Sequence, residues 1–353
     1  MCPQFACLRS IACQMRIDFS KMVGYIPKMD EIGTNLPELR IGILVIDGFA
    51  VMSYASLVEP MRAANLLGRR ALYRMINIGL TDQPITSSGA AVVMPEAQVG
   101  DELKLDYLFV VAGGDPTGFD DKQTFAWLSR QARIGVQMGG VSGGPIILAK
   151  AGLMGGRRMT VHWEHAVALA EISPHLLLER SLFVIDRDRV TCAGGTAPMD
   201  LMHALIAQHH GAPFARLVSD WFMHTEIRPS VGPQRGGLVA RVGSTNAAIL
   251  DAVRAMETNI AEPLVLEQLS DIAGISPRQL NRLFREKLGR STMRYYRDLR
   301  LDAAQNLLGN SPLSLTEIAM ATGFASPSHF SRAYAQSFGT PPSNNRTARA
   351  LRG

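Results

Sequence analysis

The segment Gly140-Val141-Ser142-Gly143-Gly144 is the part of the sequence best suited to chemistry. Its Gly-x-Ser-x-Gly spacing follows an apolar run and precedes the apolar segment Pro145 to Ala151, which predicts a sharp turn between a strand and a helix. A serine on such a turn can attack a carbonyl carbon only when a histidine base lies within hydrogen-bond reach. The sequence offers three candidate bases, His162, His165 and His203.

The interpretation that we favour for this turn is binding without catalysis. The N-terminus of the following helix, the N–H groups beside Ser142 and Gly143, and the serine hydroxyl can together bind a carboxylate. We expect no metal site, because no close cluster of histidine, cysteine and aspartate occurs. The cysteines form no Cys-x-x-Cys pair, so neither a disulfide framework nor zinc is expected, and no cofactor is predicted; they are Cys2, Cys7, Cys13 and Cys192.

Short apolar runs alternate with helical segments between Arg40 and Gly211, which predicts an α/β fold with a doubly wound parallel sheet. The expected strands are 41–46, 73–78, 107–111, 134–138 and 190–192. Glycine turns follow several of them, at positions 47–48, 113–115, 139–140 and 194–195. Ligands bind beyond the carboxyl ends of such strands, so Asp115 and Thr196 are candidate ligand-binding residues beside the elbow.

Composition and charge divide the chain. Its 353 residues are 47% hydrophobic, without an apolar run near the roughly 18 residues of a membrane span. We therefore expect a cytoplasmic protein that does not bind membranes. Residues 244–353 hold 13 Lys and Arg against 9 Asp and Glu, which makes this part the candidate for a polyanionic partner. Glycine and proline predict a linker at 227–243 between domains at 38–226 and 244–353, after a flexible extension at 1–37.

The C-terminal domain contains a tandem repeat. Leu266 to Gly289 and Leu315 to Gly339 each combine a short helix, a glycine turn, a Ser-Pro helix start and a longer helix that ends in glycine. Two helices around a short turn make a helix-turn-helix unit. The helical spacing of residues 292–308 predicts a long helix that holds the two units at a fixed separation, which suits successive major grooves of double-stranded DNA.

The second helix of each unit is amphipathic. Leu280, Leu283, Phe284 and Leu288 share one side of the first, and Phe330, Ala333, Tyr334 and Phe338 share one side of the second. A charged outer face alone would be weak evidence, but its duplication, together with eight Lys and Arg against two Asp and Glu in 276–300, favours DNA binding. The candidate DNA-binding residues are Arg278, Gln279, Arg282, Arg285, Ser328, His329, Arg332 and Gln336.

Two resemblances follow from these motifs. Residues from about 246 to 346 resemble the AraC/XylS DNA-binding domain in the stretches RQLNRLFREKLG, YYRDLRLDAAQNLL and TEIAMATGFASPSHFSRAYAQSFG. Residues 40–211 resemble the ThiJ/PfpI domain, or class I glutamine-amidotransferase-like domain, of GlxA-type regulators in RIGILVIDGF, EPMRAAN, YLFVVAGG, GGPIILAKAGLMGGRRMTVHWEH and AGGTAPMDLMHALI. These resemblances imply a flavodoxin-like sensor domain followed by an all-α tandem helix-turn-helix domain.

The second resemblance also bears on catalysis. Catalytic relatives carry a cysteine at the elbow, where this chain has Ser142, and their assisting acidic residue falls near Ser53. Both departures favour a pocket kept for sensing, so we expect no enzyme activity. Some relatives regulate the catabolism of carnitine, glycine betaine or arginine, which implies a small cationic or zwitterionic nitrogen compound as effector. Trp163 could face a quaternary ammonium group, and Glu59 could compensate its charge.

The predicted function is therefore a ligand-responsive transcription activator of a catabolic operon. Its expected partners are double-stranded DNA, a small-molecule effector, RNA polymerase and a second copy of the chain in a homodimer. Two alternatives stay open. One is a serine-dependent amidase or esterase fused to a DNA-binding domain, and the other is a repressor or architectural protein that binds DNA without a ligand.

Overall fold

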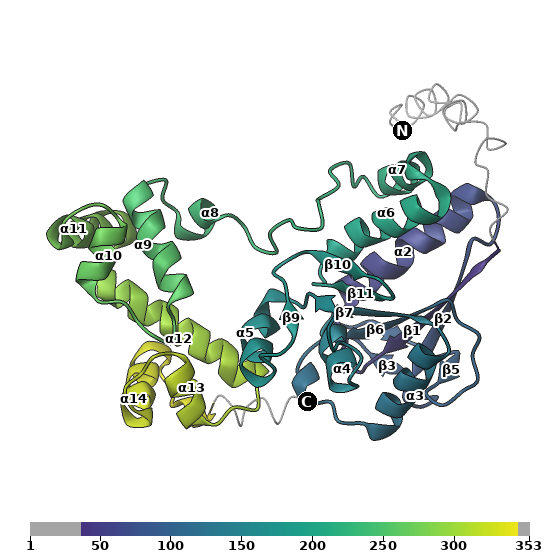
Figure 1. Ribbon diagram of the computed structural model, residues 1–353, viewed down its shortest axis with the longest axis horizontal. Coiled ribbons are helices and arrows are strands. Elements are labelled where there is room, and N and C mark those ends of the chain that lie inside the picture. Colours follow the sequence, from purple (N-terminus) through teal and green to yellow (C-terminus); the bar gives the residue numbers. More distant parts are fainter. Residues whose placement is uncertain (1–36, 345–353) are drawn as a thin grey trace, which may run out of the picture.

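The computed structural model describes residues 37–344. The predicted N-terminal extension, except its last residue, lies outside these residues, as do Cys2, Cys7, Cys13 and the chain after Asn344. The described elements form two groups that follow one another along the chain (Figure 1). Strands and helices from β1 to α7 make up the first, and helices α8 to α14 make up the second.

A seven-stranded sheet forms the centre of the first domain. Its strand order is β10-β11-β7-β6-β1-β2-β5, and all neighbouring pairs are parallel except β10 with β11. The bounds are β1 Leu39–Val45, β2 Tyr73–Gly79, β5 Ala97–Gln98, β6 Tyr107–Ala112, β7 Gln137–Ser142, β10 Phe183–Asp186 and β11 Arg189–Cys192. Two small sheets pair β3 (Ile85–Thr86) with β4 (Val92–Val93) and β8 (Arg158–Met159) with β9 (Leu177–Leu178).

Helices cover both faces of this sheet, because successive strand residues point their apolar side chains to opposite sides. Ile43 packs with helices α2 (Val51–Gly68), α6 (Ala197–His210) and α7 (Ala212–Trp221). Its neighbour Leu44 packs on the side of α3 (Lys122–Arg133), α4 (Gly144–Lys150) and α5 (Trp163–Ile172). A 3-10 turn, η3 (Pro116–Gly118), precedes α3. The predicted doubly wound, flavodoxin-like fold is confirmed.

The strand predicted at 134–138 was placed too early. Ile134 caps α3 and is 64% exposed, Gly135 has φ +92°, and the strand β7 begins only at Gln137. Gly139 and Gly140 were interpreted as a turn but lie inside β7. A Cβ at Gly139 would lie 2.1 Å from the ring of Phe109, and one at Gly140 would lie 2.6 Å from the backbone of Pro145. The glycines therefore allow close packing of the strand rather than a turn.

The second domain is entirely helical. Its helices are α8 (Leu238–Val242), α9 (Ala247–Thr258), α10 (Leu266–Ile272), α11 (Pro277–Leu288), α12 (Thr292–Asn310), α13 (Leu315–Ala321) and α14 (Pro327–Phe338). The pairs α10–α11 and α13–α14 are the two predicted helix-turn-helix units, each with its own buried cluster. Gly274 and Gly323 make the turns with φ +67° and +70°. The hydroxyls of Ser276 and Ser326 accept the N–H groups of Gln279 and His329, as the Ser-Pro starts predict.

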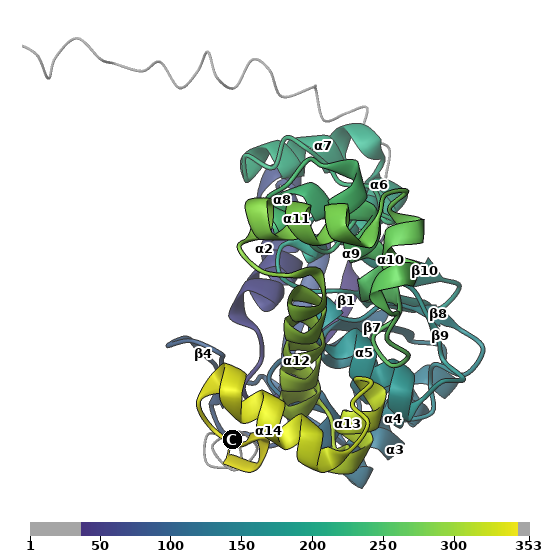
Figure 2. The same cartoon turned by 90° about the vertical axis from the view of Figure 1, so that its left-hand side faces the viewer.

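Helix α12 joins the two units and also touches the first domain. Figure 2 shows it running between α11 at one end and α14 at the other. Ala168 of α5 is fully buried in one apolar cluster with Leu301, Ala304 and Leu307 of α12. Figures 1 and 2 both place α5 against α12. The helix that spaces the two units is therefore also the helix that packs on the first domain.

The segment predicted as a linker, residues 227–243, lies against the first domain over part of its length. Arg228 binds the fully buried carboxylate of Asp200, with Nη2 2.6 Å from Oδ2. The N–H of Leu182 donates to the carbonyl oxygen of Ser230. Nε2 of Gln234 donates to the carbonyl oxygen of Ser181 at 2.7 Å. These contacts fix the path of the chain between the two domains.

Candidate ligand groove and DNA-binding surface

A groove of about 1340 Å³ lies between the two domains. The first domain contributes the ends of its strands and the start of α5, including Gly113, Ser142 and Trp163. The second contributes one face of α12, including Leu299 and Asp302. Single-ligand pockets are commonly about 300–1000 Å³, so a small metabolite would fill only part of this groove.

The predicted elbow lies at the floor of the groove. Ser142 ends β7 immediately before α4 and has φ +61°, a left-handed conformation that serine rarely adopts. Gly194 packs so tightly here that a Cβ would lie 2.7 Å from Cβ of Ser142. The N–H of Gly143 donates to the carbonyl oxygen of Ala112 at 3.1 Å, so this donor is already used within the fold. The elbow therefore offers a ligand the Ser142 side chain more readily than the Gly143 N–H.

Ser53 occupies the place near the elbow where the resemblance puts an acidic residue in catalytic relatives. It is 1% exposed and lies at the groove, and its hydroxyl accepts the N–H of Gly195 at 2.8 Å. A hydroxyl in this role binds the glycine loop without charge. The pair of serines leaves the floor of the groove neutral.

The three candidate histidine bases serve other contacts. Nδ1 of His162 accepts the N–H of Glu164 at the start of α5, and burial lowers the pKa of His162. Nδ1 of His203 lies 2.9 Å from the hydroxyl of Ser219. His165 is 4% exposed. Within residues 37–344, no hydrogen bond joins a histidine to the Ser142 hydroxyl, so the structure contains no assembled serine–histidine pair there.

Trp163 lies at the groove with an intramolecular cation on its ring. The guanidinium carbon of Arg235 is 4.4 Å from the centre of the Trp163 ring, and the tryptophan is 40% exposed. Arginine above an aromatic face is a cation–π contact. The ring that the sequence assigns to a quaternary ammonium group therefore already binds a cation from residues 227–243.

The other predicted ligand residues do not line the groove. Glu59 binds Arg62 one turn further along α2, with an Oε2–Nη2 distance of 2.6 Å. Asp115 caps η3 and accepts the hydroxyl and N–H of Thr117. The Thr196 hydroxyl accepts a hydrogen bond from Arg228. Of the six residues predicted to bind ligand, the groove brings together Ser142 and Trp163.

The acidic and basic residues of the groove come mostly from segments to which sequence reasoning assigned no ligand contact. Glu164 lies at the start of α5 and Asp302 on α12, and burial raises the pKa of Asp302. Arg241 also lines the groove, where it forms two hydrogen bonds with the Glu257 carboxylate of α9. Of these residues, only Glu164 could be expected at the ligand site from the sequence, because it directly follows Trp163. Asp302 is brought here only by the packing of two domains.

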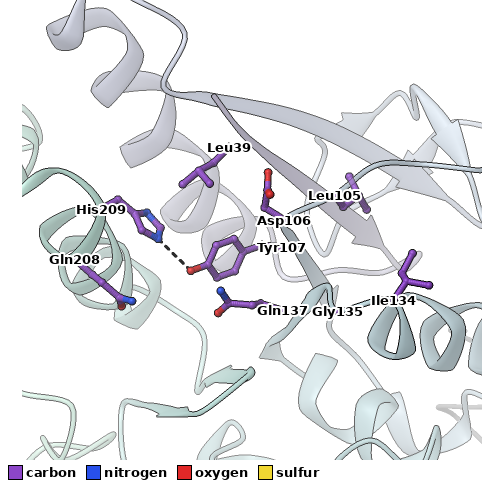
Figure 3. A pocket seen from close by; sticks show the side chains of 9 residues that line it. All are labelled: Leu39, Leu105, Asp106, Tyr107, Ile134, Gly135, Gln137, Gln208 and His209. Carbon is purple, nitrogen blue, oxygen red and sulfur yellow. Dashed lines mark hydrogen bonds between the residues drawn. The ribbon is translucent and has the colours of Figure 1, made fainter. Parts of the chain in front are cut away.

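A smaller cavity of about 500 Å³ opens at the other end of the sheet, beside the first residues of β1, β6 and β7. Figure 3 shows Tyr107 pointing toward His209 there, with Gln137 alongside. The Tyr107 hydroxyl is 3.0 Å from Nε2 of His209, and the Tyr73 hydroxyl is 3.0 Å from its Nδ1. Burial lowers the pKa of His209 to about 4, so the ring is neutral at pH 7. None of the predicted ligand residues lines this cavity.

The predicted DNA-binding side chains all lie exposed on α11 and α14. Figures 1 and 2 place both helices on the side of the second domain turned away from the first. The exposed residues are Arg278, Gln279, Arg282, Arg285, Ser328, His329, Arg332 and Gln336. The opposite faces bury Leu280, Phe284, Phe330 and Tyr334 completely. Helix α12, which joins the two units, has 19 residues and a length of about 28 Å.

The outer face of α11 is positively charged, and few acidic side chains among residues 37–344 pair with its arginines. Arg282 approaches Glu286 at 3.8 Å, but both side chains are more than half exposed. Arg278 and Arg285 form no ion pair within the described residues. Gln279 uses its Oε1 to accept the N–H of Ser276, and its amide nitrogen is not needed for that contact. Exposed arginines and amides at a helix N-terminus suit phosphate and base-edge contacts.

Residues 37–344 show neither a metal-binding cluster nor a membrane-spanning helix. They contain no group of three or more histidine, cysteine, aspartate or glutamate side chains arranged to hold a metal ion. None of their helices is both long and apolar enough to cross a membrane.

Comparisons with known proteins agree with both halves of the structure. The DJ-1/PfpI family model matches residues 39–208, and a helix-turn-helix domain model matches residues 269–348. The HTH-type transcriptional regulator GlxA of Rhizobium meliloti is 45% identical over 308 residues, which cover 87% of this chain and 95% of that protein. The HTH-type transcriptional regulator CdhR of Pseudomonas aeruginosa is 39% identical and covers 88% and 92%.

A solved structure supports the fold of the first domain. The ThiJ/PfpI family protein from Pseudomonas syringae aligns with a TM-score of 0.51 at 23% identity, over 70% of this chain and 96% of that one. At that identity the likeness concerns the fold alone. The relatives above match this chain over 95% and 92% of their own length, so the similarity extends over both domains of this chain. This chain therefore belongs to the GlxA-type family of AraC-like, DNA-binding transcriptional regulators.

Proposed function

We propose that the protein is a ligand-responsive transcription activator that senses a small cationic or zwitterionic nitrogen compound in the groove between its domains. One observation carries the proposal: the groove extends from Ser142 and Trp163 of the first domain to α12, which spaces the two DNA-reading helices. A ligand bound there contacts both domains, so its binding energy can depend on their arrangement.

The chemistry of the groove supports this ligand class. Trp163 provides an aromatic face that already binds a guanidinium group, and Glu164 and Asp302 provide carboxylates for a cation. In this proposal they take the role that the sequence assigned to Glu59. The Ser142 hydroxyl can donate to a carboxylate of the same ligand. The target is an operon for catabolism of the compound, and the protein acts in the cytoplasm as a homodimer with RNA polymerase.

Thermal shift and DNA binding test this proposal together. The purified chain is screened with quaternary amines and amino acids, because binding at 100 times Kd stabilises by about 2.7 kcal/mol. Compounds that raise the melting temperature are then added to binding titrations on DNA from upstream of the protein's own and neighbouring genes. We expect the hit to change operator affinity in the wild type and not in Trp163→Ala. A melting temperature and DNA affinity that no compound alters would favour the ligand-independent repressor.

A serine hydrolase is the second candidate, and the strained turn at Ser142 is the observation that favours it. The missing histidine contact argues against it. Hydrolysis of p-nitrophenyl acetate and small amides decides between the two functions. Turnover above background that disappears in Ser142→Ala would establish the hydrolase, whereas rates equal in both proteins support sensing.

A further inference from the structure

Arg235 is the residue through which the structure connects the ligand site to the chain between the domains. Its guanidinium group lies on the Trp163 ring, at the start of the helix α5 that packs on α12. Both side chains are exposed, and a cation–π contact at an exposed site is weak. A second cation can therefore replace Arg235 at this ring.

The residues before and after Arg235 attach the chain to the two domains, so the replacement of Arg235 by another cation would affect this attachment. Gln234, the preceding residue, donates from Nε2 to Thr160, Val161 and Ser181 of the first domain. Its Oε1 is buried and has no hydrogen-bond partner. The chain is therefore attached to the first domain at this end by the hydrogen bonds of Gln234 and by the contact of Arg235 with Trp163.

On the other side, six residues further along, Arg241 holds the second domain. It forms two hydrogen bonds with Glu257 of α9 and donates from Nε to the carbonyl oxygen of Gly236. Residues 233–242, which we call the strap, thus connect Trp163 at one end with α9 at the other. The strap also lines the groove, from Pro233 to Val242.

We propose that Arg235 is a built-in competitor for the effector, and that a cationic ligand acts by displacing it from Trp163 and releasing the strap. This inference rests on the proposed function, because it needs a cation in the groove. It adds a condition for specificity: a ligand must bring a positive charge to the Trp163 ring. A ligand of the same shape without a cationic group would leave Arg235 in place.

Hydrogen–deuterium exchange of the full chain tests the strap first without any ligand. We expect Arg235→Ala to lose protection at residues 233–242 by about tenfold, and Trp163→Ala to do the same. The matched control is Arg180→Ala, because Arg180 is another exposed arginine that lines the groove. If the exchange protection of residues 233–242 is the same in Arg235→Ala as in the wild type and in Arg180→Ala, the proposal that Arg235 holds the strap on Trp163 is wrong.

The second arm uses glycine betaine and its isostere 3,3-dimethylbutanoate, which keeps the carboxylate but has a tert-butyl group in place of the trimethylammonium group, at matched ionic strength. Calorimetric titration should show glycine betaine binding three- to tenfold more tightly to Arg235→Ala than to the wild type. Wild-type strap protection should fall with glycine betaine and stay unchanged with the isostere. Binding that depends on Trp163 but leaves strap protection and the Arg235→Ala affinity unchanged would refute the competitor while the sensing function stands. If tetramethylammonium and glycine betaine bind neither the wild type nor Arg235→Ala, cation sensing itself is wrong.

Discussion

Ser142 combines strain, burial and access to the groove in one residue. Its φ of +61° is held by the close packing of Gly194, and its side chain is 6% exposed at the floor of the groove. Backbone strain of about 1–3 kcal/mol persists only where the surrounding structure enforces it. The residue is thus fixed in place before a ligand arrives.

We predict that Ser142→Ala weakens the response to effector and leaves DNA binding without effector intact. The substitution removes one hydroxyl and keeps the methyl-sized Cβ, so the loss should be about 1 kcal/mol, or roughly fivefold in effector affinity. Titration of effector against the operator complex measures it. The control is Ser129→Ala, on the outer helix α3. An unchanged effector affinity in Ser142→Ala would remove this residue from the site.

His209 predicts how stability depends on pH. Burial, with a smaller contribution from the neighbouring His210, favours its neutral form and lowers its pKa to about 4 from an ordinary value of about 6.5. Between about pH 6.5 and pH 4 the His209 ring is protonated in the unfolded chain but stays neutral in the folded chain. The contribution of His209 to the free energy of unfolding therefore falls as the pH drops through this range.

Melting temperatures between pH 7.5 and 4.5 check this expectation. His209→Gln cannot titrate, so its melting temperature should decline less over that range than that of the wild type. The control is His175→Gln at an exposed position. Parallel curves for all three proteins would show that His209 does not contribute to the acid dependence.

At the level of single elements, α11 carries more positive charge than α14. Its exposed face has Arg278, Arg282 and Arg285, whereas Arg332 is the arginine of α14. An arginine that binds a guanine edge gives about 1–3 kcal/mol of discrimination, and one on a phosphate adds affinity without selecting sequence.

We therefore predict that Arg278→Ala or Arg282→Ala weakens operator binding more than Ser328→Ala or Gln336→Ala. The expected loss is about 1–3 kcal/mol for the arginines, measured by binding titration and footprinting at one salt concentration. Larger losses from the α14 variants would assign the dominant reader to the other helix-turn-helix unit.

Some helices and strands could be predicted from the sequence alone, and others could not. The recognition helices were predictable because Ser276 and Ser326 cap them and glycines end them, which are local signals. The start of β7 was not predictable, because Gly139 looks like a turn residue until Phe109 of the neighbouring strand is placed beside it.

The residues of the groove were also predictable only in part. Ser142 belongs to a local motif, whereas Asp302 and Arg235 reach the groove only through the packing of the two domains and the path between them.

At the scale of the whole molecule, the contact between α5 and α12 joins the first domain to the helix that links the two helix-turn-helix units. Ala168 is the small residue at its centre, buried among Leu301, Ala304 and Leu307. A larger or charged side chain there would separate the helices, because the cluster has neither space nor a partner for it.

We predict that Ala168→Glu destroys the effect of effector on operator affinity while the protein still binds DNA within a few-fold of wild type. The core of the first helix-turn-helix unit contains no residue of α5, so α11, the helix with more arginines, should stay folded. The matched control is Ala170→Glu, at an exposed position of the same helix that does not line the groove. Operator titrations with and without effector measure the coupling. If Ala168→Glu responds as fully as Ala170→Glu, this contact does not transmit the signal.

The shared groove has a thermodynamic consequence for promoters. Because both domains line it, a ligand that changes operator affinity by some factor must have its own affinity changed by the same factor when the operator is bound. Operators that hold the domains in the ligand-binding arrangement will therefore respond at lower effector concentrations than operators that do not. Under the proposed function, sensitivity to the metabolite is then a property of each promoter and the protein together, so one regulator would switch on different genes at different concentrations.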